Sequence, residues 1–230
     1  MKIVTPYAKM LPPNFRYDPN PIPFIPLDGI AMLKRIEYYA RVSHASEDMQ
    51  SDESYDRFLR SVVLQHGDLS VIEHEKVTCE FLVDRGITHE IVRHRIGSYT
   101  QESTRFVNYQ KKGGEAKFIM PDGLAGTTQG AAWASAIEIS ENSYMAMISL
   151  GCKPQIARSV FPNALASKII VTYNLRGWRH FFLMRTSSAA HPQMRQVTIP
   201  LLEDFKKNIP IIFEDIEPMA NQSDNMKKMR

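Results

Sequence analysis

The spacing of apolar and polar residues divides the chain into candidate helices and strands. Apolar side chains at Ile30, Leu33 and Ile36 recur at helical spacing and predict a helix over about residues 28–43, with Asp28 as its N-cap. The same reasoning predicts further helices over about residues 52–66, 87–95, 128–150, 154–161, 178–185, 192–208 and 210–217. Gly67 is expected to end the second helix.

Strict alternation identifies the clearest strand. Val77, Cys79, Phe81 and Val83 alternate with polar residues in EKVTCEFLVD, which is typical of a half-buried strand, and Gly86 is expected to end it. Further strands are predicted in TRFVNY (104–109), KFIM (117–120) and ASKIIVTYNL (166–175). Helices and strands in this mixture predict an α+β fold.

The two ends of the chain differ from its centre. Residues 11–26 carry many prolines and are expected to form an ordered surface arm, within a proline-rich segment over residues 1–27. Residues 218–230 form a charged tail that is expected to fray. No internal repeat or linker is visible between them, so we expect residues 1–230 to form a single domain.

Composition narrows the functional classes. The net charge of +3 permits an anionic substrate but does not indicate a nucleic-acid-binding protein. The two cysteines, Cys79 and Cys152, are too few for a disulfide scaffold and lie in no zinc-ligand pattern. No signal peptide and no apolar run of roughly 20 residues is present, so a cytoplasmic location away from membranes is expected.

The stretch HEIVRHRIGSYTQESTRF (residues 89–106) begins like a zinc-binding helix. However, His89 and His94 are five positions apart and would diverge by roughly 140° around a helix, which is too far to bind one ion. Arg93 stands where the second histidine of H-E-x-x-H would lie. No metal site is therefore predicted.

The same stretch concentrates positive charge. Arg93, His94, Arg95 and Arg105 place up to four positive groups close together, and Arg93 and Arg95 should point to different targets. The helix is expected to end at Gly97, where its dipole favours cations. Any anion here should therefore be held by side chains and not by a helix N-terminus.

Ser103 and Arg105 suggest a phosphate site. They are two positions apart, so on an extended segment both side chains would emerge from one face and could cradle a phosphate. A solvated basic turn with a helix cap is the alternative interpretation, and the residues alone do not separate the two.

Several motifs together resemble one family. R-H-R followed by seven residues and Ser103 is similar to the signature of flavin-dependent thymidylate synthases. HGDLSVIEH, IARSVFP and NLRGWRHFFLMR resemble further family elements in the expected order, so the resemblance covers roughly residues 28–215. It implies a mixed, largely antiparallel central sheet flanked by helices. It also implies a homotetramer with sites shared between subunits and an extended FAD site.

The resemblance also implies a reaction. Members of the family make dTMP from dUMP, take the methylene group of methylenetetrahydrofolate and release tetrahydrofolate. NADPH reduces FAD, which carries the hydride. Two alternatives remain at this point: a nucleotide- or nucleic-acid-binding module, and a degenerate member that binds flavin without methylating.

Matching positions identify the implied site residues. The FAD-binding set is Ser70, Arg93, His94, Arg95, Gln101, Asn174, Arg176 and His180. The dUMP-binding set is Glu90, Arg93, Gln101, Glu102, Ser103, Thr104, Arg105, Arg158 and Arg185. Arg185 matches the arginine that polarises the uracil, and Ser103 is assigned to binding because no histidine is positioned to activate it. For Arg158 the alternative is a salt bridge on a helix surface.

The chain departs from the family pattern at four positions: Asp68, Gln101, Phe106 and Pro192 replace a histidine, an acid, a tyrosine and a tryptophan. These departures concern folate entry and flavin gating more than dUMP binding.

Overall fold

The computed structural model describes residues 1–13, 27–111, 113 and 115–220, and in it the chain forms two compact units. Unit 1 comprises Met1–Tyr7, Phe81–Arg93 and Tyr99–Ile170, and unit 2 comprises Ala8–Glu80, His94–Ser98 and Val171–Arg230. The single functional domain stays a prediction.

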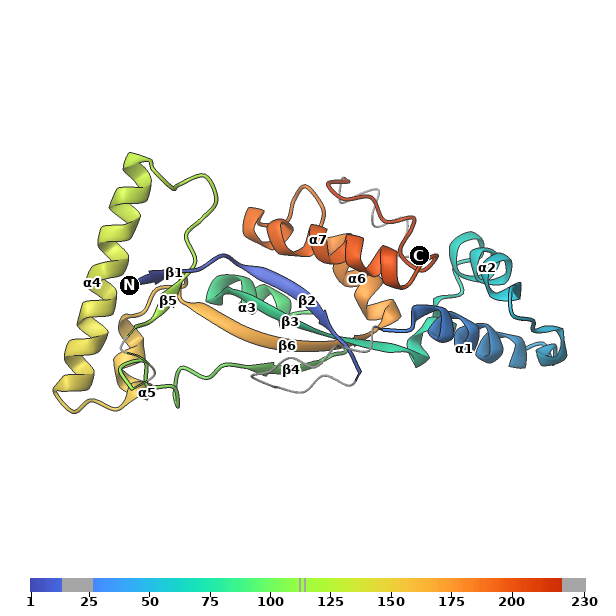
Figure 1. The fold of residues 1–230 in the computed structure, drawn as a ribbon, viewed down its shortest axis with the longest axis horizontal. Coiled ribbons are helices and arrows are strands. Elements are labelled where there is room, and N and C mark those ends of the chain that lie inside the picture. Colours follow the sequence, from blue (N-terminus) through green and yellow to red (C-terminus); the bar gives the residue numbers. More distant parts are fainter. Residues whose placement is uncertain (14–26, 112, 114, 221–230) are drawn as a thin grey trace. The chain divides into compact units, whose positions relative to one another are not determined.

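A four-stranded antiparallel sheet has the order β2 (Tyr7–Leu11), β3 (Lys76–Asp84), β6 (Ala166–Asn174) and β4 (Ser98–Gln101) (Figure 1). A second, parallel ladder pairs β1 (Lys2–Ile3) with β5 (Lys117–Phe118). The predicted strand alternation is confirmed, because Val77, Cys79, Phe81 and Val83 of β3 are all buried. The α+β class with a largely antiparallel central sheet is likewise confirmed.

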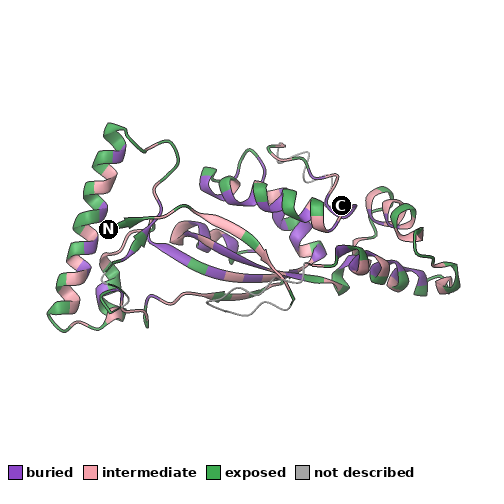
Figure 2. Cartoon of the chain, in the orientation of Figure 1, coloured by how far each residue is buried: buried purple, intermediate pink, exposed green. Residues whose placement is uncertain are grey.

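Unit 2 packs its helices around an aromatic core. The helices are α1 (Gly29–Val42), α2 (Ser54–Leu59), α6 (Leu175–Arg185) and α7 (Pro192–Asn208), with a π-helix at Arg60–Gln65 and 3₁₀ turns at Glu47–Met49 and Leu69–His74. On α6, Trp178 contacts Phe182 and Phe205 with ring centroids 5.7 and 5.1 Å apart. Buried and exposed positions alternate around α7, as Figure 2 shows. This core anchors α6, whose polar end forms part of the site.

Unit 1 has its own core. Its helices are α3 (Arg85–Ile91), α4 (Thr128–Ser149) and α5 (Pro154–Ala157), followed by a 3₁₀ turn at Arg158–Val160. Phe161 stacks on Tyr144 of α4 at 4.3 Å, and Tyr109 packs edge-on against both rings. These contacts fix the base of the segment that carries Ser103 and Arg105.

Short polar side chains start three of the helices. The Asp28 carboxylate accepts a hydrogen bond from the Ala31 amide at 2.9 Å, which confirms the predicted N-cap of α1. Asp84 and Asn174 stand at the ends of β3 and β6 and cap α3 and α6 in the same way. An Asx cap satisfies an unpaired amide of the first turn, so each strand passes directly into a helix.

Two boundaries near the basic stretch were predicted wrongly. Gly86 lies inside α3 and does not end the strand, because the Asp84 cap starts the helix one residue earlier. The helix ends at Ile91 and not near residue 95, so the positive cluster lies in the turn that follows.

The predicted strand over residues 104–109 and the predicted helix over residues 210–217 are also wrong. Turns replace the strand, and the new strand β4 precedes it. Residues 210–215 form turns because Ile211 has a φ of 73°, outside the helical region, and the Arg179 guanidinium donates to the Ile212 carbonyl. The predicted proline-rich arm and charged tail lie mostly outside the described residues.

The contact between the start of α1 and the end of α7 gives a test of the unit 2 packing. A Cβ on Gly29 would lie 1.7 Å from the Asn208 carbonyl oxygen, so Gly29→Ala must separate two backbones. We expect a loss of about 2 kcal/mol or more in the free energy of unfolding, measured by urea denaturation. In Gly86→Ala the nearest atom is the Asp84 carboxylate at 3.2 Å, and a change within about 1 kcal/mol is expected. Equal losses in both variants would contradict the packing.

Candidate functional site

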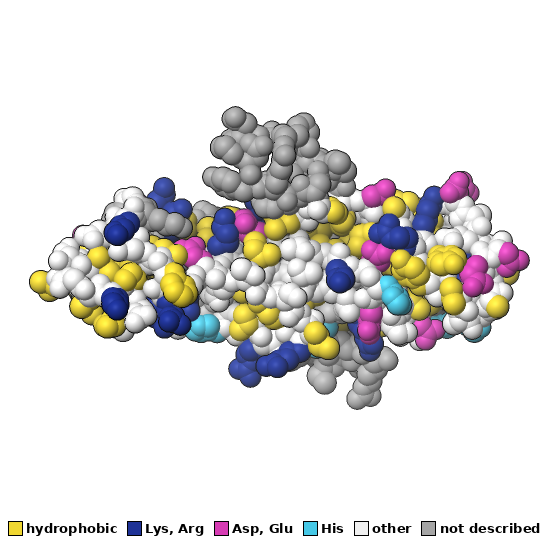
Figure 3. All heavy atoms as spheres, turned by 90° about the horizontal axis from the view of Figure 1, so that it is seen from below, with side chains coloured by type: hydrophobic (Ala, Val, Ile, Leu, Met, Phe, Trp, Pro, Cys, Tyr) yellow, Lys and Arg dark blue, Asp and Glu magenta, His cyan; other side chains and the backbone are white. Residues whose placement is uncertain are grey.

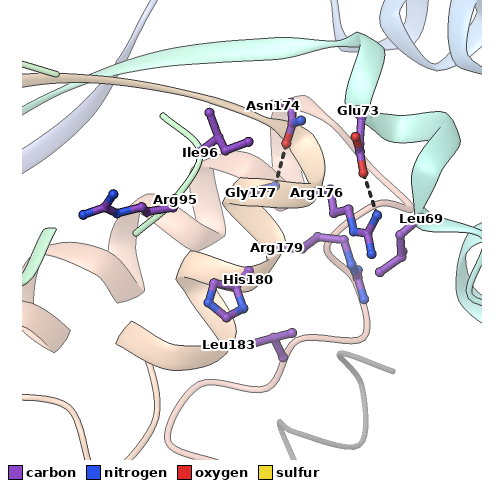
Figure 4. Close-up of a pocket in the computed structure, with 10 residues that line it drawn as sticks. All are labelled: Leu69, Glu73, Arg95, Ile96, Asn174, Arg176, Gly177, Arg179, His180 and Leu183. Atoms are coloured by element: carbon purple, nitrogen blue, oxygen red, sulfur yellow. Dashed lines mark hydrogen bonds and ion pairs between the residues drawn. The ribbon is translucent and has the colours of Figure 1, made fainter. Parts of the chain in front are cut away.

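Unit 2 contains a cavity of about 380 Å³ built from three segments that are far apart in the sequence (Figure 4). One segment follows the π-helix, the second follows α3, and the third runs from Asn174 along α6 to Leu183. The lining residues are Leu69, Glu73, Arg95, Ile96, Asn174, Arg176, Gly177, Arg179, His180 and Leu183. The lining carries three arginines and one carboxylate, and Asp215 outside the lining pairs with Arg179, so a net positive charge remains that suits an anion.

The N-terminus of α6 adds to that preference. Asn174 caps the helix by accepting from the Gly177 amide at 2.8 Å, and Arg176 lies in the first turn. The positive end of the helix dipole therefore points toward the cavity. This corrects the expectation that only side chains would hold an anion here, because that expectation considered the end of α3 alone.

Arg179 is an unusual member of the lining. It is 2% exposed, and its Nη1 and Nη2 donate to the two Asp215 oxygens at 2.6 and 2.8 Å. Its Nε has no hydrogen-bond partner among the described residues. A buried polar atom without a partner is costly, and because this Nε is itself buried, it is not exposed to the cavity.

His94 and Arg185 form the second feature of unit 2. The Arg185 Nε–H donates to His94 Nε2 at 2.8 Å, so this ring nitrogen carries no proton and the ring proton is on Nδ1. Burial, then the charge of Arg185, then His180, lower the pKa of His94 to about 3. The imidazole is therefore neutral near pH 7.

The neutral imidazole changes the charge count of the basic stretch. Only Arg93, Arg95 and Arg105 are cations, so the expected fourth positive group is absent. Desolvation, and then the charge of Arg185, also lower the pKa of His180, which lines the cavity. The arginines thus supply the positive charge, and the histidines act as neutral donors and acceptors.

The predicted phosphate segment lies in unit 1 and forms a turn. The Arg105 amide donates to Ser103 Oγ at 3.3 Å, and the Phe106 and Val107 amides donate to the Ser103 carbonyl. The expected extended geometry is therefore wrong, and the capped basic turn describes the local structure. Arg158 Nη1 donates to Thr104 Oγ1 at 3.0 Å, so this guanidinium lies at the same turn and makes no salt bridge there.

Gln101 is held by buried hydroxyls. Its Nε2 donates to Thr88 Oγ1 at 2.9 Å and to Ser167 Oγ at 3.1 Å. The Thr88 hydroxyl already donates to the Arg85 carbonyl, so it can only accept from residue 101. An amide therefore suits this position better than the acid of the family pattern.

The structure groups the predicted residues unevenly. Arg95, Asn174, Arg176 and His180 line the cavity, and Ser70 lies beside it in sequence on the Leu69–His74 turn. His94 and Arg185 pair with each other. The remaining predicted residues belong to unit 1, and they are Glu90, Arg93, Gln101, Glu102, Ser103, Thr104, Arg105 and Arg158.

Sequence reasoning missed six of the lining residues: Leu69, Glu73, Ile96, Gly177, Arg179 and Leu183. Arg179 could have been found, since it follows Arg176 by three positions and therefore shares its helix face. The apolar residues carry no chemical signal that separates them from ordinary core positions.

Among the described residues, no group of three or more histidine, cysteine or acidic side chains could hold a metal ion. No described helix is both long and apolar enough to cross a membrane. On the face shown in Figure 3, Lys and Arg side chains lie in separate groups and do not form one continuous basic patch.

Comparison with known proteins gives a consistent result. The family model described as "Thymidylate synthase complementing protein" matches residues 30–211. The chain is 31% identical over 198 residues to a flavin-dependent thymidylate synthase of Pyrococcus furiosus, covering 84% of this chain and 78% of the relative. It is 32% identical over 187 residues to one of Mycobacterium sp. (strain JLS), covering 71% and 72%.

Solved structures show the same fold. The UMP/dUMP methylase PolB from Streptomyces cacaoi, bound with 5-Br dUMP, aligns with a TM-score of 0.71 at 22% identity, covering 93% of this chain and 96% of that one. The flavin-dependent thymidylate synthase of Helicobacter pylori, complexed with FAD and dUMP, aligns with a TM-score of 0.68 at 20% identity, covering 80% and 94%.

The neutral state of His94 predicts a pH dependence of stability. Its folded pKa lies below the unfolded value near 6.5, so between these values the unfolded chain binds more protons and stability falls as the pH falls. We expect His94 to contribute on the order of 3 kcal/mol to this loss by about pH 4. In thermal melts from pH 7 to pH 4, His94→Gln should lose less stability than the wild type.

His44 provides the matched control, because it is exposed and lies outside the cavity. His44→Gln should follow the wild-type profile. If His94→Gln followed it too, the imidazole would not be held neutral by the fold.

The contacts of Gln101 with two hydroxyls predict how stability changes when glutamate, the acid of the family pattern, replaces it. Gln101→Glu replaces a donor with an acceptor opposite the Thr88 oxygen, so we expect a loss of about 1–3 kcal/mol in urea denaturation at pH 7. Gln110 donates to Ser149 Oγ on the surface, and Gln110→Glu should change stability by less than about 0.5 kcal/mol. Unchanged stability in Gln101→Glu would show that the buried hydroxyls reorient freely.

Proposed function

The chain belongs to the family of flavin-dependent thymidylate synthases, and from that premise we propose that it converts dUMP to dTMP by reductive methylation. Methylenetetrahydrofolate supplies the one-carbon unit, and NADPH supplies a hydride through FAD. The products are dTMP, tetrahydrofolate and NADP⁺. We place the reaction in the cytoplasm and in a homotetramer whose sites are shared between subunits, as the family resemblance implies.

The cavity of unit 2 is the observation that carries the flavin part of the proposal. Arg95, Arg176 and the N-terminus of α6 provide positive charge for a diphosphate. The donor set therefore fits FAD, which supplies hydride transfer when bound. The proposed FAD-binding residues are Ser70, Arg93, His94, Arg95, Gln101, Asn174, Arg176 and His180.

The capped turn of unit 1 supports a nucleotide phosphate site. Ser103 fixes the turn through its hydroxyl and carbonyl, and the guanidinium groups of Arg105 and Arg158 are available at one short segment. Arginine recognises phosphate with a planar pair of donors. The proposed dUMP-binding residues are Glu90, Arg93, Gln101, Glu102, Ser103, Thr104, Arg105, Arg158 and Arg185.

Arg185 is proposed to polarise the uracil. Its Nε donates to the neutral His94, so His94 orients the guanidinium without adding a charge of its own. A fixed cation favours the N3-ionised uracil, in which C5 is the nucleophile. His94 is thus a positioning residue for Arg185.

Cys79 of unit 2 is not a competing nucleophile. Cys79 is fully buried in β3, and burial, then Asp204, raise the pKa of its thiol well above its usual range. A buried thiol of this kind is inert. In unit 1, the Ser103 hydroxyl accepts from a backbone amide and serves the turn. A route that needs no enzyme nucleophile agrees with both observations.

Tritium release from 5-tritiated dUMP tests the proposal, because methylation replaces the hydrogen at C5. With methylenetetrahydrofolate, NADPH and added FAD, the wild type should release tritium. Arg105→Ala should raise the KM for dUMP by about tenfold or more, because it removes a charged phosphate contact. Arg185→Ala should lower kcat by roughly a hundredfold.

Arg57→Ala is the control, since Arg57 is an exposed arginine of α2 outside the cavity, and it should match the wild type. Normal activity in Arg105→Ala and Arg185→Ala would show that the site is assigned to the wrong residues. Flavin binding without tritium release would identify a degenerate member of the family.

A further inference from the structure

Glu73 places a negative charge in the cavity of unit 2. Its Oε1 lies 2.6 Å from Arg176 Nη1, and both side chains line the cavity (Figure 4). Glu73 is the only carboxylate among the described residues of that lining, which otherwise carries three arginines and a histidine. The cavity is suited to an anion, yet one of its cationic side chains, Arg176, forms an ion pair with the carboxylate of Glu73.

We propose that Glu73 is an internal competitor for the anion-binding guanidinium of Arg176. Its carboxylate takes the guanidinium nitrogen that a diphosphate would use, so the ion pair and the bound anion exclude one another. The inference rests on the proposed flavin site and adds a residue that tunes its affinity.

The geometry of the pair distinguishes a competitor from an orienting residue. Arg35 and Glu75, elsewhere in unit 2, form a two-pronged pair with contacts of 2.7 and 2.9 Å, and Arg179 and Asp215 do the same. In contrast, Glu73 accepts one hydrogen bond from Arg176 among the described residues, at 2.6 Å. A single contact leaves the guanidinium free to rotate toward another acceptor.

The solvent exposure of the Arg176–Glu73 pair also favours a competitor over an orienting residue. The Arg176 and Glu73 side chains are 50% and 44% exposed, and ion pairs with such access to solvent are weak because water screens them. The pair is therefore too weak to hold Arg176 rigidly, and a doubly charged ligand can displace it. Once displaced, the Glu73 carboxylate remains close to the ligand and repels it.

The test compares Glu73→Gln with the wild type in the binding of FAD, followed by quenching of flavin fluorescence at low ionic strength. Glu73→Gln should bind FAD about two- to tenfold more tightly, because it removes both the competition and the repulsion. The difference should shrink as salt is added. Asp48→Asn is the matched control, since it removes an exposed negative charge from unit 2 outside the cavity lining, and it should change affinity by less than about twofold.

A second comparison separates competition for Arg176 from the general electrostatic effect of removing a negative charge. In an Arg176→Ala background, the further change Glu73→Gln should tighten binding by a smaller factor than in the wild-type background. Equal factors in the two backgrounds would overturn the proposal, as would unchanged or weaker binding by Glu73→Gln alone.

Inorganic pyrophosphate keeps this test independent of the flavin. Measured by calorimetry, tighter pyrophosphate binding by Glu73→Gln than by the wild type would support the inference even if the protein took up no FAD. Equal or weaker pyrophosphate binding would overturn it. A wild-type protein that binds pyrophosphate but no FAD would overturn only the proposed flavoenzyme function.

Discussion

The arrangement of unit 2 depends on one hydrogen bond, from the Arg185 Nε–H to a buried, uncharged His94. Burying an imidazole beside a guanidinium makes its protonation unfavourable, so the ring stays an acceptor and fixes Arg185 from one side. The aromatic core under α6 holds both partners, because His94 packs edge-on against Phe181 at 5.0 Å. A protonated His94 could not accept this bond, and two adjacent cations would repel.

Much of the fold was predictable because local rules decide it. Asp28 caps α1 as predicted, and Gly67, with a φ of 76°, follows the π-helix that extends α2. The π-helical turn itself has no simple sequence signal. The strand predicted over residues 104–109 failed because its aromatic and β-branched residues favour strands in general, whereas the Ser103 cap fixes a turn at its start.

The candidate site was predictable only in part. The charged motifs identified Arg95, Arg176 and Arg185, because cations and amides carry a chemical signal of their own. Part of the cavity lining comes from segments more than a hundred residues apart, such as those that carry Glu73 and Arg176. The tertiary fold brings these segments together, and sequence spacing does not show it. The contact of Glu73 with Arg176 and the neutral state of His94 therefore could not be read from spacing, since both depend on burial and on neighbours brought by the fold.

The charge state of His94 is the most direct test of this account. Nitrogen-15 NMR of histidine-labelled protein reports protonation of each ring nitrogen. His94 should remain neutral from pH 8 to about pH 4, with Nε2 unprotonated and the proton on Nδ1. Titration of His94 near pH 6.5, or a proton on Nε2 at neutral pH, would contradict it.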